Sequence, residues 1–419
     1  MNNITNRNSD QRVVITGMGA ITPVGNTVAE MWEAFQNGRS GLTRITMLDA
    51  TSWPCQVAGE LKDFYPNKFI SRKKIRYMSQ TSQLAVIAAG QALEDSGLVL
   101  VQEDQDRIGV FIGTAAGSCV EETEQAILRL REKKRPSPFK AVEVWPNLPA
   151  YHIAEIYQVR GYNGTICTAC AASTQAIGEA AEIIRRGEAQ VMITGGAESM
   201  VSETVLAGFC AIKALATSYN DKPERAMRPF DADREGFVSA QGGAMLILES
   251  LSHAQERGAL IYAEVLGCGN STDAYHMITP DPKGEGQALA MLRALKSASV
   301  GIEAVDYINS HSTSTPLGDV AETKAIKSVF GERAYNIPIS STKSMIGHMM
   351  GAAGAVEAVA CVMSIKEGVI HPTINYETPD PECDLDYVPN EARRTGVKIA
   401  MSNSFGLGGQ NSVLVLGSI

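Results

Sequence analysis

The sequence predicts an α/β protein with buried sheets, built from two related halves. Short apolar and β-branched runs that end in Gly, Ser, Asn or His alternate with helical stretches along the chain. The 419 residues, 44% hydrophobic and 20% charged, are sufficient for a large core and exclude a disordered or fibrous chain. Glycine accounts for 38 residues, about 9% against roughly 7% on average. This excess indicates tight turns and close backbone contacts.

The first half, residues 12–250, begins with a strand at 12–22 that runs into a glycine turn, and a helix follows at 28–37. Further helices are predicted at 83–96 and 171–186, and further strands at 108–114 and 191–198. Pro223 and Pro229 mark 219–234 as a long loop. This alternation favours sheets buried between helices.

The second half, residues 258–419, repeats the pattern of the first. Each half opens with a short β-branched run that ends in a glycine, which suggests a duplication joined near 250–258, although no residue-level repeat is visible. The strands predicted in this half are 263–269, 305–311, 337–343, 399–406 and 413–416.

The charge distribution limits the partners that the chain can have. Thirty-seven basic and 46 acidic residues leave a net charge of −9, which argues against a broad nucleic-acid or anionic-membrane surface. Residues 1–11 are polar and do not resemble a secretory signal. The most apolar long window, 351–365, contains Glu357 and is shorter than the roughly 20 residues of a spanning helix. We therefore expect a soluble, cytoplasmic protein.

The eight cysteines are expected to be free thiols, most of them buried, because a long chain without an export signal gains little from disulfides. Cys167 and Cys170 have the spacing of half a metal or redox site. No second Cys-x-x-Cys or His-x-x-x-His string follows, so we predict no metal site here.

Cys170 directly precedes the helix predicted at 171–186, which is apolar on nearly every face and ends in Arg185, Arg186 and Gly187. Its thiol would therefore lie at the positive end of the helix dipole, which lowers a thiol pKa and favours a nucleophile. The alternative is an inert buried thiol, which is also the interpretation that we keep for Cys167.

Two histidines downstream each follow a predicted strand within a string rich in Ser, Thr and Gly. The first string is Asn309-Ser-His311-Ser-Thr-Ser-Thr, and the second runs from Ser340 through Lys343 to His348. A single such histidine is more often a core or capping residue. Two of them together with a candidate nucleophile indicate thioester chemistry, and the glycine-rich string 403–411 could supply backbone amide donors.

In this order the strings resemble those of the β-ketoacyl-acyl-carrier-protein synthases of the class II type, within the condensing-enzyme, thiolase-fold superfamily. The resemblance spans nearly the whole chain and implies a thiolase-like, five-layered αβαβα fold with two duplicated halves, 12–250 and 258–419. The matching strings are 13–19, the cysteine string at 167–187, 228–237, the two histidine strings and 405–409.

The resemblance also implies the reaction. An acyl thioester held on Cys170 would undergo decarboxylative Claisen condensation with malonyl-acyl-carrier protein, giving 3-oxoacyl-acyl-carrier protein and CO2 in fatty-acid chain elongation. His311 and His348 would promote decarboxylation and stabilise the enolate. Lys343 would orient the site electrostatically, and Glu357 would help to hold it.

The remaining implied roles concern substrate binding. Backbone amides of Cys170 and Phe405 would form the oxyanion hole, and Phe405 would act as a gate beside Gly406. Thr313 and Thr315 would bind the pantetheine arm, which the carrier protein brings, so no cofactor is expected. Asn403 is a supporting residue, and the family sometimes has a structural monovalent cation near the positions that match Asn309 and Asn403.

Partners follow from the same resemblance. They are acyl and malonyl carrier proteins and a second subunit, expected to be a copy of this chain, with a heterodimer possible. Because the family's carrier protein is acidic, its docking site should be basic. A helix over 68–76 would place Lys68, Arg72 and Arg76 within one sector, beside Lys73. A merely solvated charge run is the alternative, both here and at 129–135.

The chain departs from the family pattern at four positions. Together these departures favour a specialised type II polyketide or polyene ketosynthase as the alternative function, and two further functions are less favoured. A thiolase would need a second cysteine in the last glycine string, and 403–411 has none. A non-catalytic chain-length partner would usually lack the nucleophile. The departures are Ser312 for Gly, Gln241 for an acid, Leu407 for Phe and Gln410 for Thr or His.

Overall fold

The computed structural model describes residues 8–419, and ten of its strands form one large mixed sheet. Helices cover both faces of these strands, which explains why every residue of the first and seventh strands is buried. The strands before residue 251 are β1 (Val13–Ile21), β4 (Ile108–Gly113), β5 (Asn163–Ile166), β6 (Val191–Ser199) and β7 (Gln241–Ser250). Those after it are β8 (Ala263–Thr272), β9 (Tyr307–Asn309), β10 (Ile339–Ser340), β13 (Ile399–Gly406) and β14 (Gln410–Gly417).

The order of the strands repeats between the two halves. Outward from the centre of the sheet, the first half has the order β1-β7-β6-β4-β5 and the second has β8-β14-β13-β9-β10. Each strand of one half thus has a counterpart at the same position in the other, β1 with β8, β7 with β14, β6 with β13, β4 with β9 and β5 with β10, so the two halves have the same topology. In the described part of the chain, the two sets of strands join only where β1 and β8 pair antiparallel, at Val14 with Glu264 and Ile15 with Ala263. This repeat confirms the prediction of duplicated halves.

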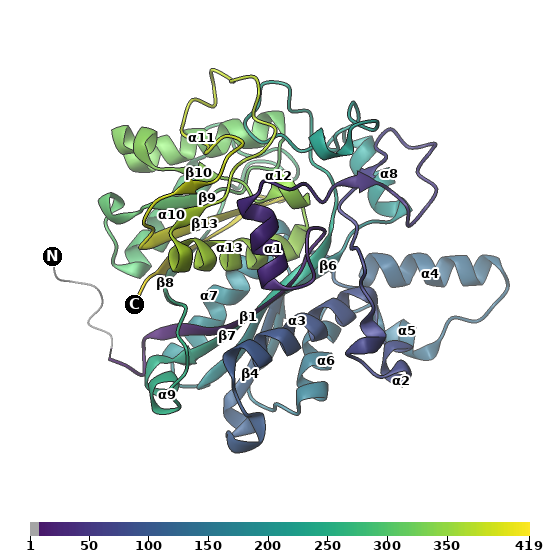
Figure 1. The fold of residues 1–419 in the computed structure, drawn as a ribbon. Coiled ribbons are helices and arrows are strands. Elements are labelled where there is room, and N and C mark those ends of the chain that lie inside the picture. The colour runs from purple at the N-terminus through teal and green to yellow at the C-terminus, as the bar shows by residue number, and fades with distance from the viewer. Residues whose placement is uncertain (1–7) are drawn as a thin grey trace.

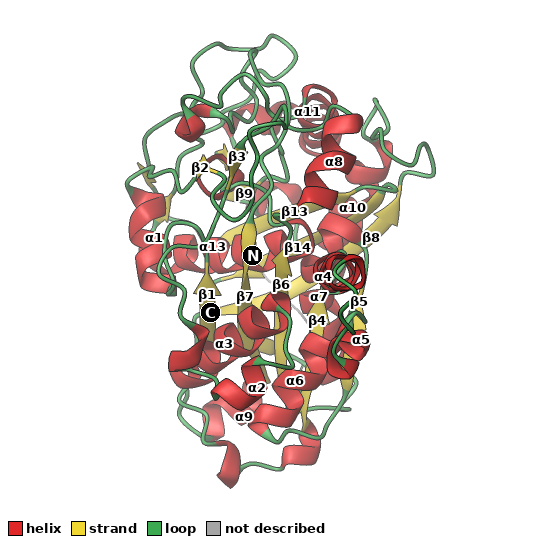
Figure 2. Cartoon of the chain, turned by 90° about the vertical axis from the view of Figure 1, so that its right-hand side faces the viewer, coloured by secondary structure: helices red, strands yellow, loops and turns green. Residues whose placement is uncertain are grey.

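The strands of the two halves form two layers, and helices between and outside them complete a five-layered arrangement (Figure 1, Figure 2). The middle layer is α7 (Ala172–Arg185) and α13 (Ala353–Glu367), which contact strands of both halves. The outer layer of the first half contains α3 (Gln80–Ser96) and α6 (Leu148–Tyr157), and that of the second contains α10 (Glu285–Ala298) and α11 (Pro316–Phe330). The predicted thiolase-like αβαβα fold is therefore confirmed.

The other helices and strands lie around this framework. Short strands form two small sheets, β2 (Thr43–Arg44) with β3 (Val57–Ala58) and β11 (Val369–Ile370) with β12 (Arg393–Arg394). The other helices are α1 (Val28–Gln36), α2 (Arg72–Ile75), α4 (Cys119–Arg131), α5 (Pro138–Glu143), α8 (Glu203–Ala211), α9 (Leu251–Glu256) and α12 (Lys343–Ile346).

The apolar window at 351–365 becomes α13 and the turn before it. The helix lies between the two sets of strands, and its residues from Ala353 to Ser364 are all buried, which explains why it is apolar around its whole circumference. Within residues 8–419, no helix has the length and apolarity needed to cross a membrane.

The sequence pattern does not predict two strands of the large sheet, β5 and β7. The central strand β7 is missed because the glycines at 242 and 243 hide the apolar run that follows them. The single helix predicted over 68–76 is wrong. Lys68 ends a 3-10 turn, Ile70 is buried, and Ser71 caps a new four-residue helix that begins at Arg72.

The predicted cationic face is therefore not one helix face, although Lys68, Arg72, Lys73 and Arg76 are all exposed. In Figures 1 and 2, α2 lies in the lower part of the molecule, whereas α8 and α11 lie in the upper part. A role for these cations in carrier binding stays a prediction.

Candidate active site

The candidate nucleophile lies where a strand end meets the buried middle helix. Cys170 is in a 3-10 turn (Ala169–Ala171) directly before α7, and only 5% of it is exposed. Ala169 has a φ of 48°, in the left-handed region, so the chain turns sharply just before the thiol. The start of α7 packs closely on β4 because Gly113 has no side chain. A Cβ at Gly113 would lie 2.2 Å from the carbonyl carbon of Ala172.

The protonation of Cys170 differs from the sequence-based expectation of a lowered pKa. Burial raises the pKa of the thiol to about 11, which outweighs the opposing effects of the Leu407 backbone amide and the Lys343 charge. The physical reason is that desolvation disfavours the thiolate more than the helix start favours it. Cys170 is thus a neutral thiol at rest and needs a base in contact to become a nucleophile.

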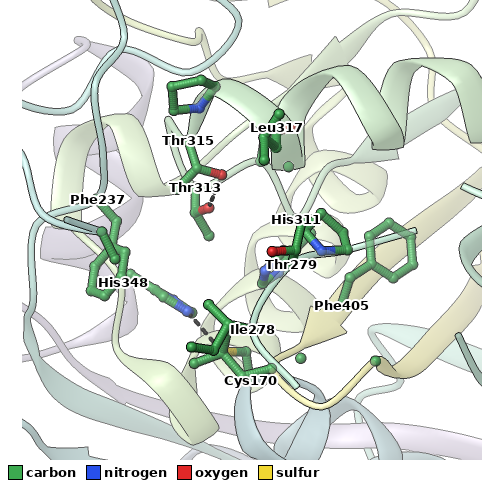
Figure 3. Close-up of a pocket in the computed structure, with 18 of the residues that line it drawn as sticks. Cys170, Phe237, Ile278, Thr279, His311, Thr313, Thr315, Leu317, His348 and Phe405 are labelled. Atoms are coloured by element: carbon green, nitrogen blue, oxygen red, sulfur yellow. Dashed lines mark hydrogen bonds between the residues drawn. The ribbon is translucent and has the colours of Figure 1, made fainter. Parts of the chain in front are cut away.

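That base is available, because the structure brings the predicted histidines to the thiol (Figure 3). The Nε2 atom of His348 lies 3.0 Å from the Sγ atom of Cys170. The His311 and His348 rings meet edge to face with centroids 5.5 Å apart. Burial, together with the charge of Lys343, holds the pKa of both imidazoles well below the usual 6.5. Both rings are therefore neutral at physiological pH and can accept or donate a proton.

Lys343 provides this charge from a fully buried ion pair. Its Nζ atom donates to the Oε1 atom of Glu357, and each side chain is only 1% exposed. Lys343 begins α12 and Glu357 lies in α13, so the pair also joins two elements beside the histidines. Burial raises the pKa of Glu357, and the ammonium group of Lys343 opposes that rise.

Glu322 is a site residue that sequence reasoning missed. One of its carboxylate oxygens accepts from the backbone N–H of His311 at 2.9 Å and from Nδ2 of Asn403 at 3.0 Å. The other accepts from the backbone N–H and the hydroxyl of Ser312 at 2.8 and 2.7 Å. Glu322 thereby fixes the strand end that carries His311. Its place on α11, one helical turn after Asp319 and close to the first histidine string, was the available signal.

A cavity of about 370 Å³ leads to these groups. Thr313 and Thr315 line it with their hydroxyl oxygens 3.2 Å apart, and their role in binding the pantetheine arm stays a prediction. Phe405 and Gly406 also line it, and the Phe405 ring lies 5.9 Å from the His311 ring. The cavity thus brings together the predicted catalytic and substrate-binding groups, apart from Lys343, whose place is beside the histidines. The gating role of Phe405 and the oxyanion hole stay predictions.

Two departures from the family pattern have local explanations. The hydroxyl of Ser312 adds a hydrogen bond to Glu322 that a glycine could not make. The amide of Gln241 donates to Ser199 Oγ at 2.9 Å and to Gln80 Oε1 at 3.2 Å, which a carboxylate could not do. Neither change disturbs the contacts of Cys170 or the histidines. Nothing in the structure explains Gln410.

Cys170, His311 and His348 could also bind a metal ion. One ligand atom each from Cys170, His311 and His348 lies within 4.8 Å of the others, a donor set that could also hold zinc. Asn309 and Asn403 each have a buried Oδ1 without a hydrogen-bond partner among residues 8–419, which fits the acceptors that a monovalent cation needs. The expectations of no catalytic metal and of a structural cation both stay predictions.

All eight cysteines are free thiols. Four are buried, Cys210 and Cys268 are half-buried, and Cys119 and Cys167 are exposed, so fewer are buried than the sequence suggested. Burial separates the two members of the Cys-x-x-Cys string, because only Cys170 lies in the cavity.

A duplicated five-layered fold with a buried Cys-His-His centre defines a thiolase-like condensing enzyme. The family models of the β-ketoacyl synthase N-terminal and C-terminal domains match residues 10–254 and 262–377. The chain belongs to the β-ketoacyl synthase family, a class of acyltransferases.

Full-length relatives agree with this assignment. The chain is 46% identical over 408 residues to the 3-oxoacyl-[acyl-carrier-protein] synthase 2 of Staphylococcus aureus, covering 97% of this chain and 98% of the relative. It is 46% identical over 411 residues to the protein of the same name from Coxiella burnetii, covering 98% and 99%.

Solved structures are similar along the same length. A β-ketoacyl synthase from Burkholderia phymatum has a TM-score of 0.90 at 38% identity. The ishigamide ketosynthase/chain length factor has a TM-score of 0.91 at 35% identity. The AntDE:AntF complex, a type II polyketide acyl-carrier protein with its ketosynthase, has 0.89 at 36%. Each of the three similarities covers 97% of this chain and 99% of the other.

Proposed function

We propose that this protein condenses an acyl thioester, held on Cys170, with malonyl-acyl-carrier protein to give 3-oxoacyl-acyl-carrier protein and CO2 in fatty-acid elongation. The observation that carries the proposal is the 3.0 Å contact between Cys170 Sγ and the neutral His348, with His311 beside it at the end of one cavity. The names of the full-length relatives support the elongation pathway.

The first step transfers the acyl group to the enzyme. His348 accepts the thiol proton while Cys170 Sγ attacks the thioester carbonyl, and the bond to the carrier's sulfur breaks. His348 then returns the proton to the departing pantetheine thiolate and becomes neutral again. Because the thiol pKa is about 11 and that of His348 is low, this proton moves only as the new bond forms.

The second step makes the carbon–carbon bond. The bond between the malonyl α-carbon and its carboxylate breaks, CO2 leaves, and the electron pair forms an enolate stabilised by N–H donors of His311 and His348. For this step His348 carries its proton on Nε2, the atom that accepts the thiol proton in the first step, so the ring changes tautomer between the two steps. The enolate carbon attacks the acyl carbonyl on Cys170, the carbon–sulfur bond breaks, and the cysteine thiolate takes a proton from solvent. Burial, together with the charge of Lys343, keeps both imidazoles neutral between turnovers.

The test uses intact-mass measurement with acyl-loaded and malonyl-loaded carrier proteins. Wild-type protein should gain one acyl group on Cys170 and then release CO2 and the 3-oxoacyl carrier. Cys170→Ala should gain no acyl group, whereas Cys167→Ser, which changes the exposed neighbour, should behave as wild type. Normal condensation by Cys170→Ala would refute the proposal, and unchanged decarboxylation by His311→Ala or His348→Ala would remove that histidine from the mechanism.

A specialised type II polyketide or polyene ketosynthase is the second candidate, with the same chemistry. It is favoured by the similarity to the ketosynthase of a type II polyketide complex and by Leu407, which replaces the family's Phe in the cavity lining. Acylation of Cys170 by a panel of carrier-bound saturated, unsaturated and β-functionalised chains separates the two. A preference for functionalised or polyunsaturated chains would support the polyketide pathway.

We also propose that two copies of this chain form a homodimer across the free edge of β5, the last strand of the sheet. Exposed apolar side chains gather on the helices beside this edge, among them Leu130 on α4, Phe139 on α5 and Tyr151 on α6. Sedimentation of the purified protein should give twice the chain mass. Assembly only with a second, different chain would indicate a heterodimer instead. The cytoplasmic location and the absence of a resident cofactor stay predictions.

A further inference from the structure

Three side chains that can bind a soft metal ion meet in the active-site cavity (Figure 3). One ligand atom each from Cys170, His311 and His348 lies within 4.8 Å of the others, and all three residues are buried. Across residues 8–419, no other group of three or more His, Cys, Asp or Glu side chains brings its ligand atoms together in this way. We call these three residues the thiol–imidazole cluster.

The spacing of the cluster is close to that of a tetrahedral zinc site. Zinc–sulfur bonds of about 2.3 Å and zinc–nitrogen bonds of about 2.0–2.1 Å place sulfur and nitrogen about 3.6 Å apart and two nitrogens about 3.3 Å apart. Cys170 Sγ and His348 Nε2 are 3.0 Å apart, and no two of the three ligand atoms are more than 4.8 Å apart. Side-chain shifts of about 1 Å therefore suffice for all three to bind one ion. The adjoining cavity of about 370 Å³ leaves room for a water molecule as the fourth ligand.

The chemistry of the donors selects a soft metal ion. Thiolate and imidazole ligands favour Zn²⁺, whereas Mg²⁺ requires oxygen ligands. Each imidazole is neutral at physiological pH and so has a nitrogen lone pair free for a metal. When zinc binds, the S–H bond of Cys170 breaks, the sulfur forms a bond to zinc and the proton leaves to water.

Two features of the surroundings make zinc binding reversible. The Nδ1 atom of His348 is buried without a hydrogen-bond partner among the residues that the structure describes, so no acceptor orients the ring once Nε2 binds a metal. Absence of such an acceptor costs about 10–100-fold in metal affinity. The ammonium group of Lys343, whose charge acts on both histidines, also repels a divalent cation. The cluster is thus suited to an ion that enters and leaves through the cavity.

We propose that Zn²⁺ binds reversibly to Cys170, His311 and His348 and thereby inhibits acylation of the protein. Zinc bound to Cys170 Sγ and His348 Nε2 occupies both the nucleophile and the base that the first step requires. Only the inhibition of acylation rests on the proposed function. The binding of zinc follows from the donor set alone, and it can be measured without an acyl substrate.

The experiment measures protection of Cys170 from alkylation in the full-length protein. Iodoacetamide labelling is followed by peptide mass with Zn²⁺, with Mg²⁺ and without added metal, and the exposed thiols of Cys119 and Cys167 are internal controls. Zn²⁺ at about ten times its dissociation constant should slow the labelling of Cys170 about tenfold. Mg²⁺ should leave the rate unchanged, EDTA should restore it, and the two control thiols should be labelled at the same rate throughout.

The variant His311→Gln distinguishes the cluster from zinc bound to the thiol alone. Loss of a ligand should cost at least as much as loss of an outer partner, so this variant should need about tenfold more Zn²⁺ for the same protection. His152→Gln is the matched control, because His152 lies on α6 and does not line the cavity. The comparison of Zn²⁺ with Mg²⁺ on the wild-type protein stands even where His311→Gln fails to fold.

The outcomes separate the metal site from the proposed function. Protection of Cys170 by Zn²⁺ together with a matching loss of its acylation supports the proposal. Equal effects of Zn²⁺ on all three thiols, no protection, or equal protection of wild type and a His311→Gln variant with a wild-type circular dichroism spectrum overturns the site. Protection with an unchanged acylation rate overturns the inhibition. Protein that zinc protects but that carrier-bound substrates never acylate would overturn the proposed function and leave the metal site standing.

Discussion

The buried ion pair between Lys343 and Glu357 allows a quantitative test of how the site is held. Glu357→Ala would leave the Lys343 ammonium group without its counterion at a position that is 1% exposed. Removing one partner of a buried pair costs about 3–5 kcal/mol, because the remaining charge stays desolvated. Replacing both partners by apolar residues of similar volume is neutral or stabilising. Lys343→Met/Glu357→Leu should therefore be at least about 3 kcal/mol more stable than Glu357→Ala.

Urea unfolding followed by circular dichroism measures these free energies if the slopes of the transitions agree between variants. The matched control is Glu33→Ala, which breaks the pair with Arg39. Those side chains are 63% and 52% exposed, so the loss should be below about 1 kcal/mol. A Glu357→Ala loss as small as that of the control, or a double variant no more stable than Glu357→Ala, would refute the reasoning. Either result would mean that water reaches Lys343 in solution.

Three further predictions concern protonation and packing. Because the pKa values of His348 and His311 lie well below 6.5, the rate of Cys170 acylation by acyl-pantetheine should not drop with a midpoint near pH 6.5 as the pH is lowered from about 8 to about 5.5. A midpoint near pH 6.5 would contradict the neutral state assigned to the two histidines. Gly113→Ala should destabilise the protein by about 3 kcal/mol in urea, since its Cβ would meet the α7 backbone. Gly208→Ala, in open space on α8, should instead stabilise it by about 0.5–1 kcal/mol; equal effects would disprove the packing argument. Hydrogen bonds to the carboxylates of Glu249 and Glu103 raise the pKa of His253. The contribution of His253 to the free energy of unfolding is therefore fully present below pH 6.5 and is lost as the pH rises through the raised pKa. The difference in urea midpoint between wild type and His253→Gln should shrink from pH 6 to pH 9. A difference that grows over this range would contradict the predicted loss of stabilisation with rising pH.

Local sequence was informative where chemistry depends on residues close together in the chain. The string before α7 identified Cys170, and two strand-end strings identified His311 and His348, because functional side chains concentrate where strands end. Strand and helix alternation predicted the helices α1, α3 and α7, three of the five large-sheet strands of the first half and all five of those of the second. The break at Ser71, which divides the predicted cationic helix, depends on burying Ile70 against the core. Periodicity alone cannot show that burial.

The sequence by itself determined the class of fold, the duplication and the three candidate side chains that one cavity brings together, since these follow from the order of local strings. The tertiary structure decided the protonation state of Cys170, the anchoring role of Glu322 and the meeting of residues from both halves in one cavity. The physical reason is that desolvation and long-range contact depend on which segments pack together. A thiol at a helix start has a lowered pKa in water, and only the packed structure shows that burial raises it.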